Sequence, residues 1–190
     1  MRREPLTGAV ILPFIPGLPL RKKTRRHIPL ISWYLGWKGT AVDIRQDIPD
    51  RFWYGAEPQL IEELRGEEAE KAIPQIKKLA ATYPYGKTYN AWPGPNSNTF
   101  ISYIVRNVPE LTVELPPHAI GKDWSPKLIE KSESGSGYQL TFYGLFGVTV
   151  GRAEGIEINI LGLNFGVDFY RPALKLPLFG RIGLKDEPLQ

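Results

Sequence analysis

The stretch Tyr138-Gln139-Leu140-Thr141-Phe142-Tyr143 begins the part of this 190-residue chain that decides its fold class. Three further apolar runs follow it, over residues 148–152, 156–161 and 163–169, and each interval between runs contains glycine. Apolar runs of this length that are separated by tight glycine turns are typical of β-hairpins. The region therefore predicts a meander of strands in one antiparallel sheet.

The neighbouring polar segments predict no cofactor. Residues 132–137 are rich in serine and glycine, which favours a mobile linker. The turn at residues 144–147 has neither a following helix nor the full glycine pattern of a dinucleotide site. Asp123, Glu157 and Asp168 could form a carboxylate pair in principle, but their spacing does not bring any two of them together.

Upstream of the sheet, Trp92-Pro93-Gly94-Pro95-Asn96-Ser97-Asn98-Thr99-Phe100 places a turn and short polar side chains directly before a helical pattern. Apolar residues then recur at helical spacing until Pro109, which predicts a helix from Asn96 or Ser97 to near Val108. Serine at a helix start has two interpretations. Its oxygen is a common N-terminal cap, and the same position suits a nucleophile or an anion site.

The first half of the chain predicts a hairpin and two helices. Strands are expected over residues 31–37 and 40–44, with glycines between them. A short helix is expected over residues 59–64, because Pro58 suits a first helical turn and Gly66 suits a stop. A longer amphipathic helix is expected over residues 67–83, with Pro74 kinking or restarting it.

Together these elements predict an α+β fold in which two or three helices pack on an antiparallel sheet. The chain is 42% hydrophobic and has 18 prolines and 19 glycines, which favours one compact domain of short elements over a helical bundle. We expect a basic, irregular N-terminal arm over residues 1–29, a single α+β domain over residues 30–185 and a tail over residues 186–190.

Composition excludes several classes of site. The chain has no cysteine, which rules out disulfides, thiolate catalysis and zinc-thiolate centres, and its two histidines make a histidine-rich metal site improbable. The apolar segment over residues 8–20 is shorter than the roughly 20 residues of a membrane helix and contains three prolines, so we expect no transmembrane segment there. The cytoplasm is the default location.

Positive charge is concentrated near the N-terminus. The chain has a net charge of +4, and within residues 1–26 the cations face Glu4 alone, which leaves the remainder slightly acidic. Such an arm could dock on nucleic acid or on an anionic membrane, although runs of this kind are more often solvated. The cations nearest to the folded region are Arg21, Lys22, Lys23, Arg25 and Arg26.

Several motifs occur in a distinctive order, over residues 52–60, 92–100, 109–111, 115–117, 119–124, 162–168 and 171–177. In this order they resemble the uncharacterised bacterial family called domain of unknown function 3750. The likeness extends from about Gly36 to Gly183. It implies membership of a family without an assigned reaction, so it points to a family more clearly than to an activity.

The element Asn96-Ser97-Asn98-Thr99-Phe100 is also similar to the Asn-Cys-x-x-Phe element of circularly permuted, papain-like (NlpC/P60-type) hydrolases and acyltransferases. That resemblance implies a permuted papain-like core with Ser97 in the position of the nucleophilic cysteine. A serine hydroxyl needs a neighbouring base. The histidine-bearing strand of the family is not evident upstream, which leaves His27, His118 and Lys122 as candidates.

Three functions remain open from the sequence. The leading interpretation is a protein of unknown function that has lost the papain-like cysteine and binds a small molecule or peptide without reacting. Its ligand would contact Trp92, Asn96, Asn98, Tyr85 and Tyr89, because aromatic rings there could stack on it. The alternatives are a serine-dependent hydrolase or acyltransferase acting on an amide or ester, and an interaction protein that docks through its basic arm.

Overall fold

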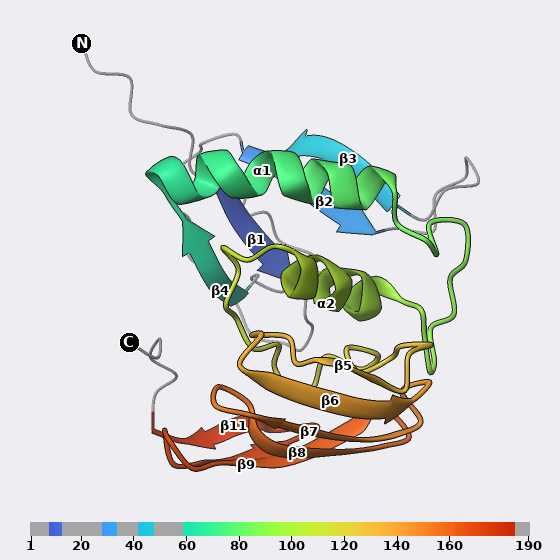
Figure 1. Cartoon of the computed structure of the whole chain (residues 1–190), viewed down its shortest axis with the longest axis vertical. Coiled ribbons are helices and arrows are strands. Elements are labelled where there is room, and N and C mark those ends of the chain that lie inside the picture. The colour runs from blue at the N-terminus through green and yellow to red at the C-terminus, as the bar shows by residue number, and fades with distance from the viewer. Residues whose placement is uncertain (1–7, 13–27, 34–41, 48–58, 185–190) are drawn as a thin grey trace, which may run out of the picture. The chain divides into compact units, whose positions relative to one another are not determined.

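Figure 1 shows the chain as a computed structural model, which describes residues 8–12, 28–33, 42–47 and 59–184. The chain forms two compact units, Met1–Lys87 and Thr88–Gln190. Most of the predicted basic arm, with His27 and the cations of residues 21–26, lies outside the described residues, and the predicted domain bounds stay a prediction. The described helices and strands form an α+β fold, as the sequence predicts.

The first unit contains two antiparallel strand pairs. Strand β2 (Ile28–Trp33) pairs with β3 (Val42–Asp47), which confirms the predicted hairpin. Strand β1 (Gly8–Leu12) pairs with β4 (Gln59–Leu64), with a shift in register between Val10 and Ile11. Part of the arm over residues 1–29, which the sequence predicts to be irregular, is therefore a strand.

The prediction of a short helix over residues 59–64 is wrong, because this segment is β4. Proline is compatible with the residues just before a strand as well as with a first helical turn, so Pro58 did not discriminate between them. A six-residue helix is also too short to be stable by itself, whereas a strand of that length gains backbone hydrogen bonds from β1.

Helix α1 (Gly66–Ala81) confirms the longer predicted helix. It runs through Pro74 without restarting, and Ala69, Ala72 and Ala80 are its buried residues. Two glutamates lie in the first turn and Lys78 lies in the last, an arrangement that complements the helix dipole.

The second unit combines helix α2 (Ser97–Asn107) with a seven-stranded antiparallel sheet. The sheet is a continuous meander in the order β11-β10-β9-β8-β7-β6-β5. Its strands are β5 (Ile129–Lys131), β6 (Gly137–Phe142), β7 (Phe146–Gly151), β8 (Gly155–Ile160), β9 (Leu163–Asp168), β10 (Ala173–Leu176) and β11 (Gly180–Gly183).

The four predicted strands are confirmed as β6 to β9, and the sequence analysis missed β5, β10 and β11. These three strands have only three or four residues each, too few for a clear alternation. The predicted linker over residues 132–137 is instead a structured hairpin loop. Ser132 and Glu133 are buried there, and Glu133 Oε2 accepts a hydrogen bond from the backbone N–H of Leu115 at 3.0 Å.

The sheet has an unusual polarity. One row of paired positions crosses it through Gln139, Thr149, Glu157, Gly166, Lys175 and Arg181, and its side chains are buried or half-buried. We call this side the inner face. The next row crosses through Tyr138, Val150, Ile156, Val167, Leu174 and Ile182, all exposed. We call that side the outer face.

The polar side chains of the inner face form hydrogen bonds and ion pairs with other segments of the same unit. Asp123, in the connection after α2, accepts hydrogen bonds through its backbone oxygen from Gln139 Nε2 at 2.8 Å and from Thr141 Oγ1 at 2.9 Å. Arg106 of α2 donates to Glu130 at 2.9 Å and contacts Gln139. No described helix is long and apolar enough to cross a bilayer.

Candidate functional site

The first candidate site is the N-terminus of α2, where Asn96 caps the helix. Its Oδ1 accepts hydrogen bonds from the backbone N–H groups of Asn98 at 3.0 Å and Thr99 at 3.1 Å. The hydroxyl of Thr99 in turn accepts from the backbone N–H of Asn96 at 3.1 Å, which completes a capping box. Of the two predicted helix starts, the cap is therefore Asn96 and the first helical residue is Ser97.

The same asparagine holds the cap against a distant loop. Asn96 Nδ2 donates to the backbone oxygens of Ala91 and Ile120, both at 3.0 Å, and Asn98 Nδ2 donates to Ile120 at 2.8 Å. Gly121 has a φ of +93°, and a Cβ atom there would lie 2.3 Å from Asn96 Nδ2. Asn96 and Asn98 thus have structural partners, and glycine is required for the close approach.

Trp92 links this region to the sheet through a hydrogen bond, and part of its ring is exposed to solvent. Its Nε1 donates to the backbone oxygen of Leu161 at 2.9 Å, in the turn between β8 and β9, and the residue is 53% exposed. Tyr89 is half-buried in the same unit. Tyr85 belongs to the first unit, where its half-buried ring meets Tyr83 edge to face at 5.6 Å. These rings remain only a predicted ligand contact.

Ser97 is half-buried at the first helical position, and its side chain makes no hydrogen bond to another described residue. Of the predicted bases, His27 lies outside the described residues, and neither His118 nor Lys122 forms a hydrogen bond with Ser97. His118 lies beside the turn between β10 and β11, where a Cβ atom on Gly180 would lie 3.6 Å from His118 Nδ1. Burial lowers the pKa of His118.

Lys122 lies in an environment that does not suit a general base. Its Nζ lies 2.8 Å from Glu157, 3.1 Å from Asp123 and 3.9 Å from Glu133, and the residue is buried. Burial alone would lower the pKa of Lys122, but these three carboxylates raise it well above its usual value. A general base must release its proton near neutral pH. The geometry therefore gives Lys122 a structural role.

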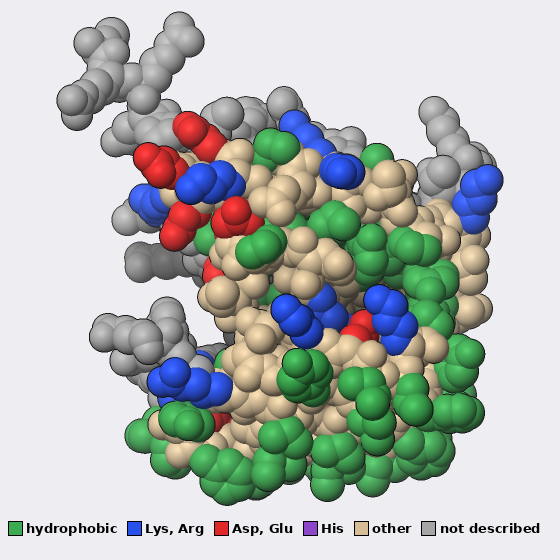
Figure 2. All heavy atoms as spheres, in the orientation of Figure 1, with side chains coloured by type: hydrophobic (Ala, Val, Ile, Leu, Met, Phe, Trp, Pro, Cys, Tyr) green, Lys and Arg blue, Asp and Glu red, His purple; other side chains and the backbone are tan. Residues whose placement is uncertain are grey.

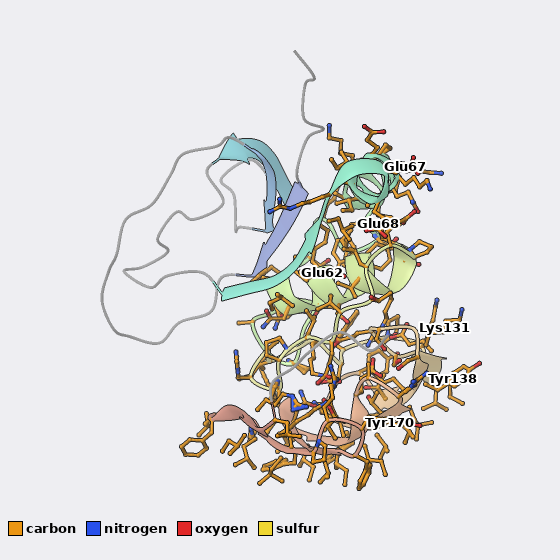
Figure 3. The ribbon with its side chains drawn as sticks, turned by 90° about the vertical axis from the view of Figure 1, so that its left-hand side faces the viewer. Glu62, Glu67, Glu68, Lys131, Tyr138 and Tyr170 are labelled. Atoms are coloured by element: carbon orange, nitrogen blue, oxygen red, sulfur yellow. The ribbon has the colours of Figure 1, made fainter. Side chains whose placement is uncertain are left out.

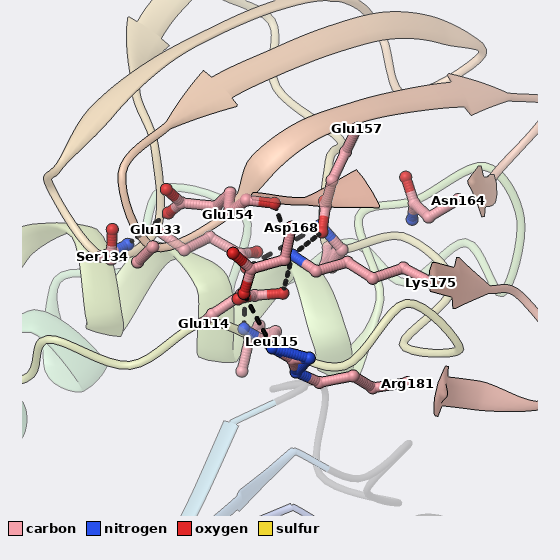
Figure 4. A network of polar contacts seen from close by, with 12 residues as sticks. Glu114, Leu115, Glu133, Ser134, Glu154, Glu157, Asn164, Asp168, Lys175 and Arg181 are labelled. Carbon is pink, nitrogen blue, oxygen red and sulfur yellow. Dashed lines mark hydrogen bonds and ion pairs between the residues drawn. The ribbon is translucent and has the colours of Figure 1, made fainter. Parts of the chain in front are cut away.

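Lys122 belongs to the second candidate site, a buried network of charges on the inner face. Figure 4 labels Glu157 and Lys175 of this network. Glu157 is its centre, because one carboxylate oxygen binds Lys122 at 2.8 Å and the other binds Lys175 at 2.9 Å. Lys175 is fully buried and also contacts Glu114 and the backbone oxygen of Glu154. Gly166 leaves room for this bridge, since a Cβ atom there would lie 2.9 Å from Glu157 Cγ.

The network continues toward both ends of the sheet. Asp123 Oδ2 accepts hydrogen bonds from Asn164 Nδ2 at 2.7 Å and from Asn159 Nδ2 at 3.2 Å. Asp168 binds Arg171 at 3.1 Å and Arg181 at 2.8 Å. Lys122 thus brings Asp123 and Glu157 together, which their spacing in the sequence did not indicate.

Two carboxyl groups of the network have raised pKa values. Burial raises the pKa of Glu114 to about 8, even though Lys175 and Lys122 lower it in part. Burial likewise raises the pKa of Glu133 to about 7 against the opposing effect of Lys122 and Arg106. Glu157 shows the reverse outcome: burial raises its pKa, but Lys122 and Lys175 together bring it below the ordinary value.

The network has the composition of a structural core rather than a reaction centre. Its carboxylates are bonded to lysine, arginine or amide groups inside the unit, and burial leaves little access for a substrate. Among the described residues no group of three or more His, Asp or Glu side chains could hold a metal ion. Sequence reasoning missed the network because the alternation of Glu157, Asn159 and Asn164, Asp168 marks a shared face without revealing that this face is buried.

The third candidate site is the outer face of the sheet. Tyr138 is 66% exposed, Phe142 57% and Ile158 47%, and the same pattern continues through β9 to β11. Figure 2 shows hydrophobic side chains gathered along the lower margin of the view, where Figure 1 draws β7, β8 and β9. Soluble proteins rarely expose continuous apolar patches above a few hundred Å², and larger patches mark interaction sites.

Comparison with known proteins gives one match. The family model described as "Protein of unknown function (DUF3750)" matches residues 21–124. No curated protein and no solved structure matches the chain. The matched segment includes α1, α2 and Lys122 and ends before β5, so the later motifs that contributed to the resemblance lie outside it.

The first prediction separates the cap from the candidate nucleophile. Asn96→Ala should lower the free energy of unfolding by about 1–3 kcal/mol, because it leaves two backbone N–H groups and two loop carbonyls with fewer partners. Ser97→Ala should change it by less than about 0.5 kcal/mol. Asn96→Asp keeps the accepting oxygen and loses the donor, so its loss of unfolding free energy should lie between those of the two alanine variants. Urea unfolding measures all three, and equal losses for Ala at both positions would contradict the assignment of the cap.

The second prediction concerns pH. A carboxyl group whose pKa is raised by folding retains a proton that the unfolded chain releases, so stability falls as pH rises from 4.5 toward the folded value of about 8. Between about pH 7.5 and pH 8.5, where a histidine with a pKa of 6.5 or lower is largely neutral, wild-type stability should decrease. Glu114→Gln resembles the protonated acid, and its unfolding free energy should depend less on pH there. An equal slope in both proteins would contradict the raised pKa.

Proposed function

Because the chain belongs to DUF3750, a family of unknown function, we propose a role from its own side chains: it is a non-catalytic binding protein whose binding surface is the outer face of β5–β11. The observation that supports this role is the inverted polarity of the sheet. Its polar side is buried within its own unit, and its apolar side is exposed.

The size of the outer face supports a binding role. Four strands of six residues and three strands of three or four residues, spaced about 4.8 Å apart and rising 3.3 Å per residue, define a surface of roughly 550 Å². Such a patch is at the upper end of the about 300–600 Å² of the largest apolar patch on a typical soluble monomer, and patches of that size are often functional. Covering it would release about 25 cal/mol for each Å² of apolar surface removed from water, before the costs of association.

The register of the sheet makes the exposed patch a fixed feature of the fold. Shifting a strand by one residue would exchange its inner and outer side chains. Such a shift would carry Glu157 and Lys175 out of their ion pair and take from Lys122 its closest carboxylate. The buried network therefore favours the one register that keeps Ile156, Ile158 and Ile160 outside.

A second candidate function is a serine-dependent hydrolase or acyltransferase with the predicted permuted papain-like site. It is favoured by one observation: Asn96 provides the helix cap, so the Ser97 hydroxyl is not needed for capping. Against it, Lys122 is held as a charged partner of three carboxylates. A bacterial origin, a cytoplasmic location and docking through the basic arm stay predictions of the sequence.

The third prediction tests the exposed outer face with two adjacent residues of β8. In a sheet that buries its apolar side, a charge at position 158 would strongly destabilise the fold, and an apolar residue at position 159 would be tolerated. Here Ile158→Glu should lower the free energy of unfolding by less than about 1 kcal/mol, since Ile158 is 47% exposed. Asn159→Leu should lower it by about 2–4 kcal/mol, because Asn159 is buried and donates to Asp123 and Asn164.

Unfolding in urea at low protein concentration measures both variants, and an apolar dye that fluoresces on exposed hydrophobic surface provides a second readout. Wild-type protein should enhance the dye's fluorescence, and Ile158→Glu should reduce it while circular dichroism stays unchanged. If Ile158→Glu destabilises the protein more than Asn159→Leu does, the outer face is covered inside the folded chain and the binding role is wrong.

The fourth prediction decides between binding and catalysis at Ser97. A non-catalytic protein should not be labelled by a serine-directed fluorophosphonate probe, because a serine without a base is a weak nucleophile. Mass spectrometry of the intact, folded protein measures the label. Labelling that disappears in Ser97→Ala and persists in Ser102→Ala would establish the hydrolase alternative instead.

A further inference from the structure

We infer that the outer face binds an anionic lipid bilayer, a conclusion that rests on the proposed function and names its partner. An apolar surface by itself does not identify what covers it. The exposed charges around this face identify its partner, because those described between Thr88 and Leu184 have a single sign.

Every Asp and Glu described between Thr88 and Leu184 is buried or half-buried. The exposed charged side chains in the same range are Lys127, Lys131 and Arg152. Most of the described acidic groups of this unit pair with the lysines and arginines of the buried network. An approaching surface therefore meets apolar side chains bordered by cations, which is the charge pattern that attracts anionic lipids.

The cations are placed within or next to the apolar surface. Lys131 pairs with Tyr138 across β5 and β6, in the row that continues through Val150 and Ile156, so it lies on the outer face itself. It is the one charged side chain in the outer rows of β5–β11. A lysine at the rim of an apolar surface can bury its methylene groups in that surface and direct its ammonium toward lipid headgroups.

Aromatic residues accompany these cations. The guanidinium of Arg152 lies 5.3 Å from the centre of the Tyr170 ring. Figure 3 labels Lys131, Tyr138 and Tyr170 along the end of the sheet formed by the β5–β6, β7–β8 and β9–β10 connections. Tyrosine, with an apolar ring and a polar hydroxyl, is enriched where a protein meets the headgroup region of a membrane.

The opposite end of the sheet exposes apolar side chains that the fold does not require. Leu178 and Phe179, in the turn between β10 and β11, are 77% and 75% exposed. Turns that face water are ordinarily polar. Apolar turn residues of this kind are suited to insertion between lipid chains, while the flat outer face lies against the bilayer surface.

A second copy of the chain fits the charges less well. Two outer faces stacked through a two-fold axis would bring cationic rims together, with no exposed carboxylate of the described unit to compensate them. The surface of roughly 550 Å² on each side is also below the about 800 Å² of a standard interface.

The fifth prediction uses flotation of the full-length protein with vesicles of phosphatidylcholine alone and of phosphatidylcholine mixed equally with phosphatidylglycerol. Wild-type protein should float with the mixed vesicles and bind them at least about tenfold better than the neutral ones. Added salt should weaken this binding, because it screens the exposed cations.

Four single variants provide the matched comparison. Ile158→Glu should reduce binding to the mixed vesicles about tenfold, and Lys131→Glu should reduce it several-fold. Ala81→Glu and Lys77→Glu make the same changes in charge at exposed positions of α1, and their binding should equal that of the wild type. A further variant, with Arg21, Lys22, Lys23, Arg25 and Arg26 all replaced by glutamine, should retain its dependence on Ile158.

The possible failures are distinguishable. If the protein does not float although Ile158→Glu folds normally, the outer face is free but its partner is not a bilayer, and the inference is wrong. A dimer in sedimentation that Ile158→Glu dissociates, without flotation, would assign the face to a second copy. Flotation that the arm variant abolishes and Ile158→Glu leaves intact would assign binding to the arm. If Ile158→Glu unfolds the protein, the proposed function itself fails.

Discussion

The bridge from Lys122 through Glu157 to Lys175 is the interaction on which the second unit depends. It joins the connection after α2 to two strands of the sheet, and none of its three side chains is exposed to water. Buried ion pairs of this kind contribute little net stability relative to apolar packing, but removing one partner leaves a desolvated charge that is costly. Their effect is to disfavour every arrangement in which the pairs are broken, so the bridge specifies which side of the sheet is buried.

The exposed apolar surface follows from that choice by geometry. Side chains alternate across a strand, so a sheet that buries Glu157 and Asn159 must expose Ile156, Ile158 and Ile160. A conventional sheet would bury the isoleucines and leave the polar residues in water. The chain instead satisfies its polar residues internally and leaves apolar area available for a partner, which is the combination expected when burial occurs on association rather than on folding alone.

Much of this fold could be predicted from the sequence, and the failures have physical reasons. Runs of apolar residues between glycines located β6 to β9, and helical periodicity located α1 and α2. The error at β4 arose because Pro58 is compatible with the start of either element, and the decisive pairing partner, β1, is far away in the chain. The cap was ambiguous between Asn96 and Ser97, since both side chains can accept the same hydrogen bonds and only the loop at Ile120 selects asparagine. The polarity of the sheet was beyond sequence reasoning, because alternation defines two faces without stating which one meets the core.

The family match ends between Lys122 and the partners of Lys122 in the sheet. The matched residues 21–124 include Glu114, Lys122 and Asp123, but their principal partners Glu157, Asn164 and Lys175 all follow the match. If the matched segment folded without the sheet, Lys122 would lose its closest carboxylate and Asp123 would lose its amide donors. Lys122 and Asp123 would still pair with each other, but keeping them buried without their partners from the sheet is unfavourable. The part of the matched segment that contains α2 and the sheet that follows it are therefore one folding unit, and the apolar outer face is a property of that unit rather than of a detachable extension.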